Sequence, residues 1–219
     1  MVLLMSETDL HQKSPYRVQV LFVGLILIIG FSRHLPLSYP EWFNFSPALS
    51  IFLISGAMMR GAWSWVAPVC AVFVTDLMIN PSYGVHLLEP FMIATYLAYL
   101  LVFLFGKSLF NTKSLLRLVG GGIAGALVFH AITCAFAWWS NPAYAKTLNG
   151  LIQALTIGQP GFPPAYLFLK NTLISSILFT FTIGWVALRM QVPVLPTACL
   201  LYTSPSPRDQ RGSRMPSSA

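Results

Sequence analysis

The stretch Leu118–Ser140 reads LVGGGIAGALVFHAITCAFAWWS, and it decides the fold of the chain. Its 23 residues include no Asp, Glu, Lys or Arg. As an α-helix the stretch is about 34 Å long, which matches a bilayer hydrocarbon core about 30 Å thick. Because that core holds no water to bond a loose backbone, an apolar run of this length must be helical. The stretch therefore predicts a transmembrane helix.

The composition of the whole chain agrees with a membrane protein. Of the 219 residues, 56% are hydrophobic and 9% are charged, and the formal net charge is +7. Soluble domains carry about a quarter charged residues, so this chain would have too little polar surface to stay in water. These values exclude a soluble enzyme, a nucleic-acid-binding protein and a disordered protein.

Six apolar segments are predicted to cross the membrane. The first, second and fourth are short for a full span, but flanking residues or a locally thinner bilayer can complete them. The alternation expected of barrel strands is absent. We therefore expect an all-α fold, a polytopic transmembrane helical bundle of about six spans. The segments are Val18–Phe31, Ser46–Met59, Ala62–Ile79, Phe91–Phe105, Leu118–Ser140 and Tyr166–Leu188.

The Lys and Arg residues between these segments predict the orientation. An N-terminus inside the cell places seven of them in the cytoplasm and three outside, and positive charge favours the cytoplasmic side. We expect residues 1–17 to form a cytoplasmic tail rather than a cleavable signal, residues 18–190 to hold the six spans, and both termini to be cytoplasmic. The inside set is Lys13, Arg17, Arg60, Lys107, Lys113, Arg117 and Arg189, and the outside set is Arg33, Lys146 and Lys170.

The last part of the chain differs sharply from the rest. From Cys199 to Ala219 it is rich in Ser, Pro and Arg and has no apolar period. It can be read as a disordered cytoplasmic tail, but it also resembles the translation of a transposon-end sequencing adapter. We expect residues 199–219 to be such an artefact and residues 191–198 to be a truncated C-terminal end.

Small residues spaced four apart predict where helices approach one another, because such faces allow close packing in lipid. The same spacing also arises by chance in segments rich in Ala and Gly. The pairs are Gly121 with Gly125, Gly122 with Ala126, Ala94 with Ala98, and Ala67 with Ala71.

The polar residues of the spans and their connections converge on the outer half of the predicted bundle. Asp76 is the one acidic residue within a span, and a carboxylate in a membrane is costly unless it is paired or faces water. It either lines a pocket or forms a structural ion pair with Arg33 or Lys170. His130 either lines the pocket or bonds a neighbouring helix, and Lys170 either contacts solute or extends to the interface. The candidate substrate-binding residues are Asp76, His130, Lys170, Asn171, Arg33 and Asn44.

Two outer connections are predicted to be ordered. The segment Arg33–Pro47 holds three prolines and four aromatic residues, which stiffen a loop and let it cap a pocket. In the segment Asn141–Pro164, residues Tyr144–Ile157 have the apolar spacing of a helix that lies in the membrane interface. Long ordered loops are often lids or binding loops, although a plain surface loop is the commoner case.

No catalytic or cofactor chemistry is predicted. The chain lacks a Gly-Lys-Ser/Thr phosphate loop, an HExxH pair and a nucleophile with an adjacent base, so we expect neither an enzyme nor a bound cofactor. The histidines match no metal-ligand spacing, and no metal is expected. Cys70 and Cys134 have no CxxC partner, and we expect them to be buried thiols.

The chain resembles a bacterial family of small multi-span membrane proteins of unknown function. The resemblance covers Val18 to Leu188 and is carried by Arg33, Pro36 and the Asn44-Phe-Ser-Pro47 run, by Pro68 with Asp76, and by Thr133, Trp138, Tyr144, Thr147 and Gly150-Leu151. In size, span number and polar lining, the chain also looks like the substrate-binding S component of energy-coupling factor transporters. That second likeness implies partnership with a coupling subunit and two ATPases, although helix one lacks the small-residue pattern expected for docking.

Two functions follow as hypotheses for a protein of the bacterial cytoplasmic membrane. The first is a transport component in which an outward-facing pocket binds a small polar solute and the Arg33–Pro47 loop acts as its lid. The second is a structural or assembly scaffold in which the same polar residues only tie helices together. The expected partners are the lipid bilayer, a small polar solute and, for transport, a coupling subunit with ATPases; no nucleic acid is expected.

Overall fold

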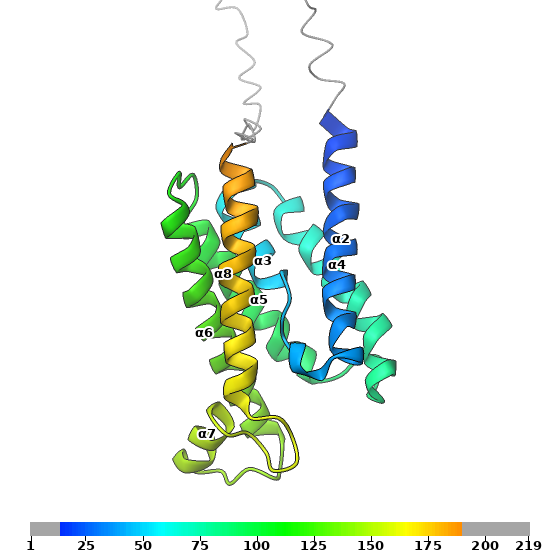
Figure 1. Cartoon of the computed structure of the whole chain (residues 1–219), viewed down its shortest axis with the longest axis vertical. Coiled ribbons are helices and arrows are strands. Elements are labelled where there is room, and N and C mark those ends of the chain that lie inside the picture. Colours follow the sequence, from blue (N-terminus) through cyan, green and yellow to red (C-terminus); the bar gives the residue numbers. More distant parts are fainter. Residues whose placement is uncertain (1–13, 190–219) are drawn as a thin grey trace, which may run out of the picture.

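The computed structural model describes residues 14–189, and within them every regular element is helical (Figure 1). The all-α prediction is therefore confirmed for this part of the chain. Four helical segments are long and apolar enough to cross a membrane: Trp63–Tyr83, Phe91–Ser108, Leu115–Ser140 and Ala165–Arg189. The first of them combines an α-helix that ends at Ile79 with the 3-10 helix that follows it. The α-helices are α2 (Ser14–Ser38), α3 (Ala48–Met58), α4 (Trp63–Ile79), α5 (Phe91–Ser108), α6 (Leu115–Ser140), α7 (Leu148–Leu155) and α8 (Ala165–Arg189), with short 3-10 helices η1 (Pro40–Trp42) and η2 (Asn80–Tyr83).

The described chain begins and ends at the same end of the bundle. Figure 1 places the start of α2 and the end of α8 together, whereas η1, η2 and α7 lie at the opposite end. We name these the tail end and the loop end. Residues 14–17, expected in a tail, are instead the first turn of α2. Residues 1–13 and the predicted segments 191–198 and 199–219 lie outside the described residues.

Helix α2 continues past its predicted end at Phe31. Residues 33–38, expected to belong to a loop, are helical although Pro36 lies among them. The helix continues because the Tyr39 N–H donates to the Leu35 carbonyl at 2.9 Å, and His34 Nδ1 lies 2.8 Å from the Gly30 carbonyl oxygen. The connection to α3 is therefore Tyr39–Pro47, which is shorter than the predicted lid and carries Arg33 on a helix instead.

Helix α3 has only 11 residues, and ten of them are buried. An α-helix of this length is about 16 Å long, roughly half the hydrocarbon core, so α3 is a central helix enclosed by its neighbours. It crosses α5 where two glycines meet: a Cβ on Gly56 would overlap the Phe103 carbonyl oxygen, and one on Gly106 would overlap the Leu53 carbonyl oxygen. Backbone therefore touches backbone at this crossing.

The interior has large apolar and aromatic side chains around α3, and mostly small or hydroxylated residues where α6 and α8 are buried. Phe52 is fully buried and stacks on Tyr99 with ring centroids 4.6 Å apart. Gly121, Gly122 and Gly125 are buried in α6, as the small-residue spacing predicted, and Gly122 would overlap the Thr180 hydroxyl if it carried a Cβ. Large apolar side chains cover the outside instead, among them Ile93, Leu97, Leu104, Leu127, Ile174 and Phe181.

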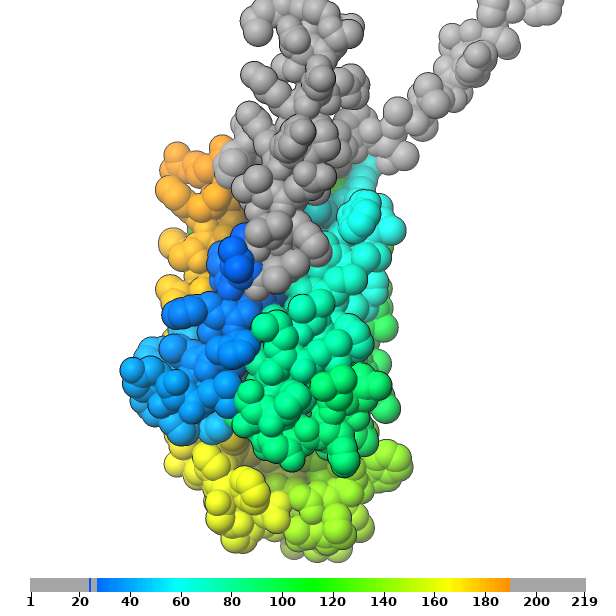
Figure 2. Space-filling model, turned by 90° about the vertical axis from the view of Figure 1, so that its right-hand side faces the viewer, coloured from blue at the N-terminus to red at the C-terminus, as the bar shows by residue number. Residues whose placement is uncertain are grey.

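The segment between α6 and α8 covers the loop end, as Figure 2 shows. Its helix α7 is shorter than the predicted Tyr144–Ile157 and begins after Thr147, whose hydroxyl accepts the Gly150 N–H at 3.3 Å. Gly150 and Ala154 face the protein, whereas Leu148 and Ile152 are exposed. The ammonium of Lys146 donates to carbonyls in the last turn of α6, which fixes the start of this segment.

The glycine contact between α3 and α5 gives a stability prediction. Replacing Gly106 by Ala pushes a methyl group into the α3 backbone, which cannot move as a flexible side chain would. We expect Gly106→Ala to lower the free energy of unfolding in detergent by about 1–3 kcal/mol, the usual effect of overpacking.

The matched control is Gly120→Ala, because a Cβ at Gly120 on α6 meets nothing within 4 Å. This change should leave the thermal midpoint unchanged or raise it slightly, since Ala favours a helix more than Gly does. Equal midpoints for the two variants would contradict the close crossing of α3 and α5.

Candidate functional site

The side chain of Asp76 lies between three helices near the loop end. It projects from α4, forms an ion pair with Arg33 of α2, and accepts a hydrogen bond at Oδ2 from the Tyr96 hydroxyl of α5 at 2.9 Å. Asp76 is 3% exposed. A carboxylate this buried is tolerated because both of its oxygens have a donor and one donor is a cation.

The ion pair is asymmetric in its exposure. The side chain of Arg33 is 22% exposed, against 4% for Asp76. A guanidinium group is planar and has five N–H donors. Arg33 therefore has donors beyond those that face Asp76. The pair is therefore anchored inside the bundle, and its cationic partner is partly accessible from the cavity beside it.

A cavity of about 430 Å³ opens beside this pair. Its polar lining includes Arg33 and Asp76 together with hydroxyl and amide side chains from the surrounding elements: Ser32, Asn44, Ser46, Asn80, Thr95, Thr133 and Thr172. Its aromatic lining consists of Phe43, Phe45, Tyr83, Phe91, Tyr99 and Phe129. Such a mixture of apolar walls and a few converging polar groups is typical of small-molecule pockets, which usually measure about 300–1,000 Å³.

The cavity exists where α3 begins. In the view of Figure 1 the chain after η1 rises between α2 and α8 to reach the start of α3. Phe43, Asn44, Phe45 and Ser46 of this segment line the cavity, as does Ala48 at the first position of α3. Because the central helix is short, the loop-end half of the bundle holds a connecting segment and open space where a longer helix would lie.

Of the six candidate residues, Arg33, Asp76 and Asn44 line this cavity. Asn44 is exposed and has a positive φ of 61°, a conformation that Asn tolerates better than most residues. These three come together from α2, α4 and the segment after η1.

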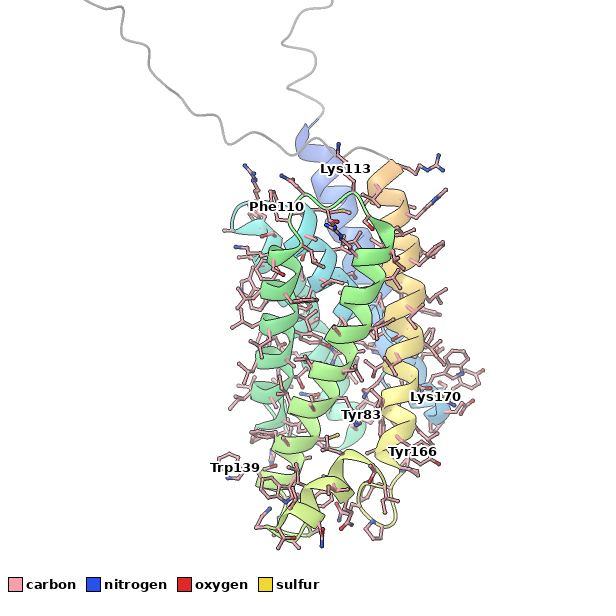
Figure 3. All side chains as sticks on the ribbon, turned by 90° about the vertical axis from the view of Figure 1, so that its left-hand side faces the viewer. Tyr83, Phe110, Lys113, Trp139, Tyr166 and Lys170 are labelled. Carbon is pink, nitrogen blue, oxygen red and sulfur yellow. The ribbon has the colours of Figure 1, made fainter. Side chains whose placement is uncertain are left out.

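The other three candidates lie elsewhere. His130 places Nε2 2.9 Å from the Leu155 carbonyl oxygen, so it links α6 to α7. Lys170 is exposed at the edge of the bundle, as Figure 3 shows. Asn171 donates to the carbonyls of Glu41 and Phe43 at 2.8 and 2.9 Å, and therefore holds the connection that lines the cavity without lining it itself.

Several residues at the site were not among the candidates. Tyr96, which binds Asp76, and Tyr99, which lines the cavity, lie in an apolar run where a tyrosine does not stand out from other aromatic residues. Glu89 also lines the cavity, and its charge beside the start of an apolar segment was the available signal.

The two described cysteines are less buried than expected. Cys70, predicted to be buried, is exposed on α4, and Cys134 is partly buried on α6 with Sγ 3.7 Å from the ring nitrogens of His130. The apolar sequence around Cys70 does not reveal which side of the helix faces outward. Both thiols are free.

Four apolar helices of spanning length, apolar outer faces and a polar cavity at one end define a multi-span helical membrane protein. The chain belongs to a family of unknown function, DUF6580, whose family model matches residues 13–195. No curated protein and no solved structure matches it. The resemblance to a family of unknown function is thus confirmed, whereas the likeness to S components receives no support from these comparisons.

The ion pair at the site gives a second stability prediction. Asp76→Ala leaves the Arg33 guanidinium without its counter-charge, which for a buried pair costs about 3–5 kcal/mol. Tyr96→Phe removes a single hydrogen bond to a charged group and should cost about 1.5–3 kcal/mol. Unfolding followed in detergent should therefore rank the variants in this order.

The double variant Arg33→Met with Asp76→Leu is the control, because it removes both charges and keeps apolar volume. It should be more stable than Asp76→Ala alone. A double variant as unstable as the sum of Arg33→Met and Asp76→Leu, each measured alone, would show that the two side chains are not energetically coupled.

Proposed function

We propose that the protein is a membrane-embedded binding component that captures a small polar solute in the cavity at its loop end and takes part in its transport. The single observation that carries this proposal is the cavity itself, about 430 Å³ in volume and lined by charged, hydroxyl, amide and aromatic side chains. Interiors of membrane bundles normally close on small residues and do not leave polar space of this size. A bound solute would account for a polar space of this size.

Access to the cavity is from the loop end. Tyr83 and Val85 line the cavity and are 41% and 42% exposed. Both belong to the segment around η2, which forms one side of the opening, while the connection after η1 forms the other. The solute can therefore enter without passing between the long helices.

The distribution of charge supports an outward-facing cavity in a bacterial cytoplasmic membrane. Arg60, Lys107, Lys113, Arg117 and Arg189 are exposed and belong to elements that meet at the tail end (Figure 3). The other described charges, three basic and three acidic, belong to the loop-end half. Positive charge favours the cytoplasmic side, so we propose that the tail end is cytoplasmic and that the cavity opens outside.

Capture by this chain would be one step of transport. The sequence contains no phosphate-binding loop, so energy for uptake would come from separate ATPases working through a coupling subunit. We therefore propose a coupling subunit and ATPases as partners, in addition to the lipid bilayer that surrounds the protein.

A scaffold function is the second candidate, and a specific observation favours it. The polar side chains that are costly in a membrane are largely bonded within the protein: Asp76 to Arg33 and Tyr96, and His130 to Leu155. A protein that only holds helices together for envelope assembly would need these bonds and no solute.

Ligand-induced stabilisation distinguishes the two functions. A panel of vitamins, amines, organic acids and metal ions is added to the full chain in a neutral detergent, and the thermal midpoint is measured. A solute at about 100 times its dissociation constant adds roughly 2.7 kcal/mol to the free energy of unfolding, so we expect at least one member of the panel to raise the midpoint by several degrees.

Tyr83→Ala should weaken that stabilisation because Tyr83 lines the cavity, whereas Tyr166→Ala should not. The second residue is a fair control because it is 55% exposed, against 41% for Tyr83, and lies on α8 away from the lining. A panel without any stabilising member would reject solute capture and leave the scaffold function.

A further inference from the structure

The charges that line the cavity do not balance. Its lining includes one cation, Arg33, and two carboxylates, Asp76 and Glu89. Lys146 and Lys170 are not among the lining residues. Taken together, the groups that face the cavity carry one negative charge more than positive charge at neutral pH.

Arg33 is not free to balance Glu89. Among the side chains that the structure describes, the one ion pair joins Arg33 to Asp76, and Tyr96 supplies a further donor to the same carboxylate. Glu89 is half-buried just before α5, and it has no ion-pair partner among the described side chains. The charge of Arg33 is offset by that of Asp76, so Glu89 is the lining carboxylate that remains to pair with a solute.

The start of α3 also faces the cavity and is weakly positive, as helix N-termini are. The N–H group of Ala48, at the first position of α3, donates to the Ser46 hydroxyl at 3.3 Å and is therefore not available to a solute. A half-charge shared among backbone groups is smaller than the full charge of a carboxylate. The balance in the cavity therefore remains negative.

Aromatic rings supply the second, independent observation. Six rings line the cavity, and they include neighbouring pairs: Phe43 and Tyr83, with centroids 6.4 Å apart, and Tyr99 and Phe129, with centroids 5.4 Å apart. Ring faces attract cations electrostatically and stack on flat apolar molecules. Neither property favours an anion.

From these two observations we infer that the cavity selects a small ring-bearing organic cation, with its ammonium group at Glu89 and its ring among the aromatic side chains. This inference rests on the proposed solute-binding function and names the class of solute. The half-buried position of Glu89 matters because a charge pair gains strength as water is removed from around it. A neutral analogue would keep the ring contacts and lose the charge contact, while an anionic analogue would meet repulsion.

Three probes of similar size test this selectivity. They are protonated 2-phenylethylamine, neutral 2-phenylethanol and anionic phenylacetate, each titrated at neutral pH into the full chain in a neutral detergent, with affinity measured by calorimetry. The amine is expected to bind at least about tenfold more tightly than the alcohol, and phenylacetate should bind more weakly than either.

Substitution of the carboxylate identifies its role. Glu89→Gln should reduce the preference for the amine over the alcohol to about twofold or less, while the affinity for the alcohol stays unchanged. Glu41→Gln is the matched control, because Glu41 is an exposed carboxylate of η1 that does not line the cavity. The control should keep the full preference.

Each alternative outcome overturns a defined statement. Tighter binding of the alcohol or of phenylacetate by the unmodified chain would reject cation selectivity and leave solute binding in place. A preference that survives Glu89→Gln would reject the assignment to Glu89. Failure of all three probes at millimolar concentration would reject the ring-bearing cation, whereas rejection of solute binding itself requires failure of the wider panel described above.

Discussion

The short central helix α3 is the constraint on which the rest of the structure depends. At 11 residues it cannot reach across a bilayer, so its backbone ends must be enclosed by protein rather than exposed to lipid. The neighbouring long helices supply that enclosure, and α5 approaches closely enough for Gly56 and Gly106 to meet the opposite backbone. The space beyond the start of α3 is then left to the connection from η1 and to the cavity. The short length of α3 thus accounts both for its tight enclosure and for the space that the cavity occupies.

Where α6 and α8 face the interior, their buried residues are mostly small or hydroxylated, whereas many large apolar side chains cover the outside of the bundle. Ser50 accepts a hydrogen bond from the Thr180 hydroxyl at 2.9 Å and donates to the Ser176 carbonyl at 3.3 Å, which joins α3 to α8. In lipid, apolar surface is already in an apolar solvent, so helices associate through close packing and bonds of this kind. The polar interior is therefore part of what holds the helices together, and the cavity is an enlargement of it.

Much of the architecture could be predicted from the sequence, and the failures have physical causes. Apolar length identified the long helices, and the rarity of charge identified Asp76. The segment Ser46–Met59 was expected to span, but a helix buried in protein and one buried in lipid have the same apolar sequence, and only length separates them. The position of Pro36 suggested a loop, yet a proline near a helix end costs few hydrogen bonds. The contact of His130 with a backbone carbonyl of α7 left no pattern in the sequence, because every residue has that carbonyl.

The double hydrogen bond of Asn171 has a mechanical consequence. One side-chain amide holds two successive parts of the connection, at Glu41 and at Phe43, and it does so from the second turn of α8. Moving that connection away from α8 breaks both bonds together, at a net cost of about 1–3 kcal/mol. The connection at the cavity wall and the second turn of α8 are therefore tied at one side chain, so loss of the Asn171 amide would release both contacts at once.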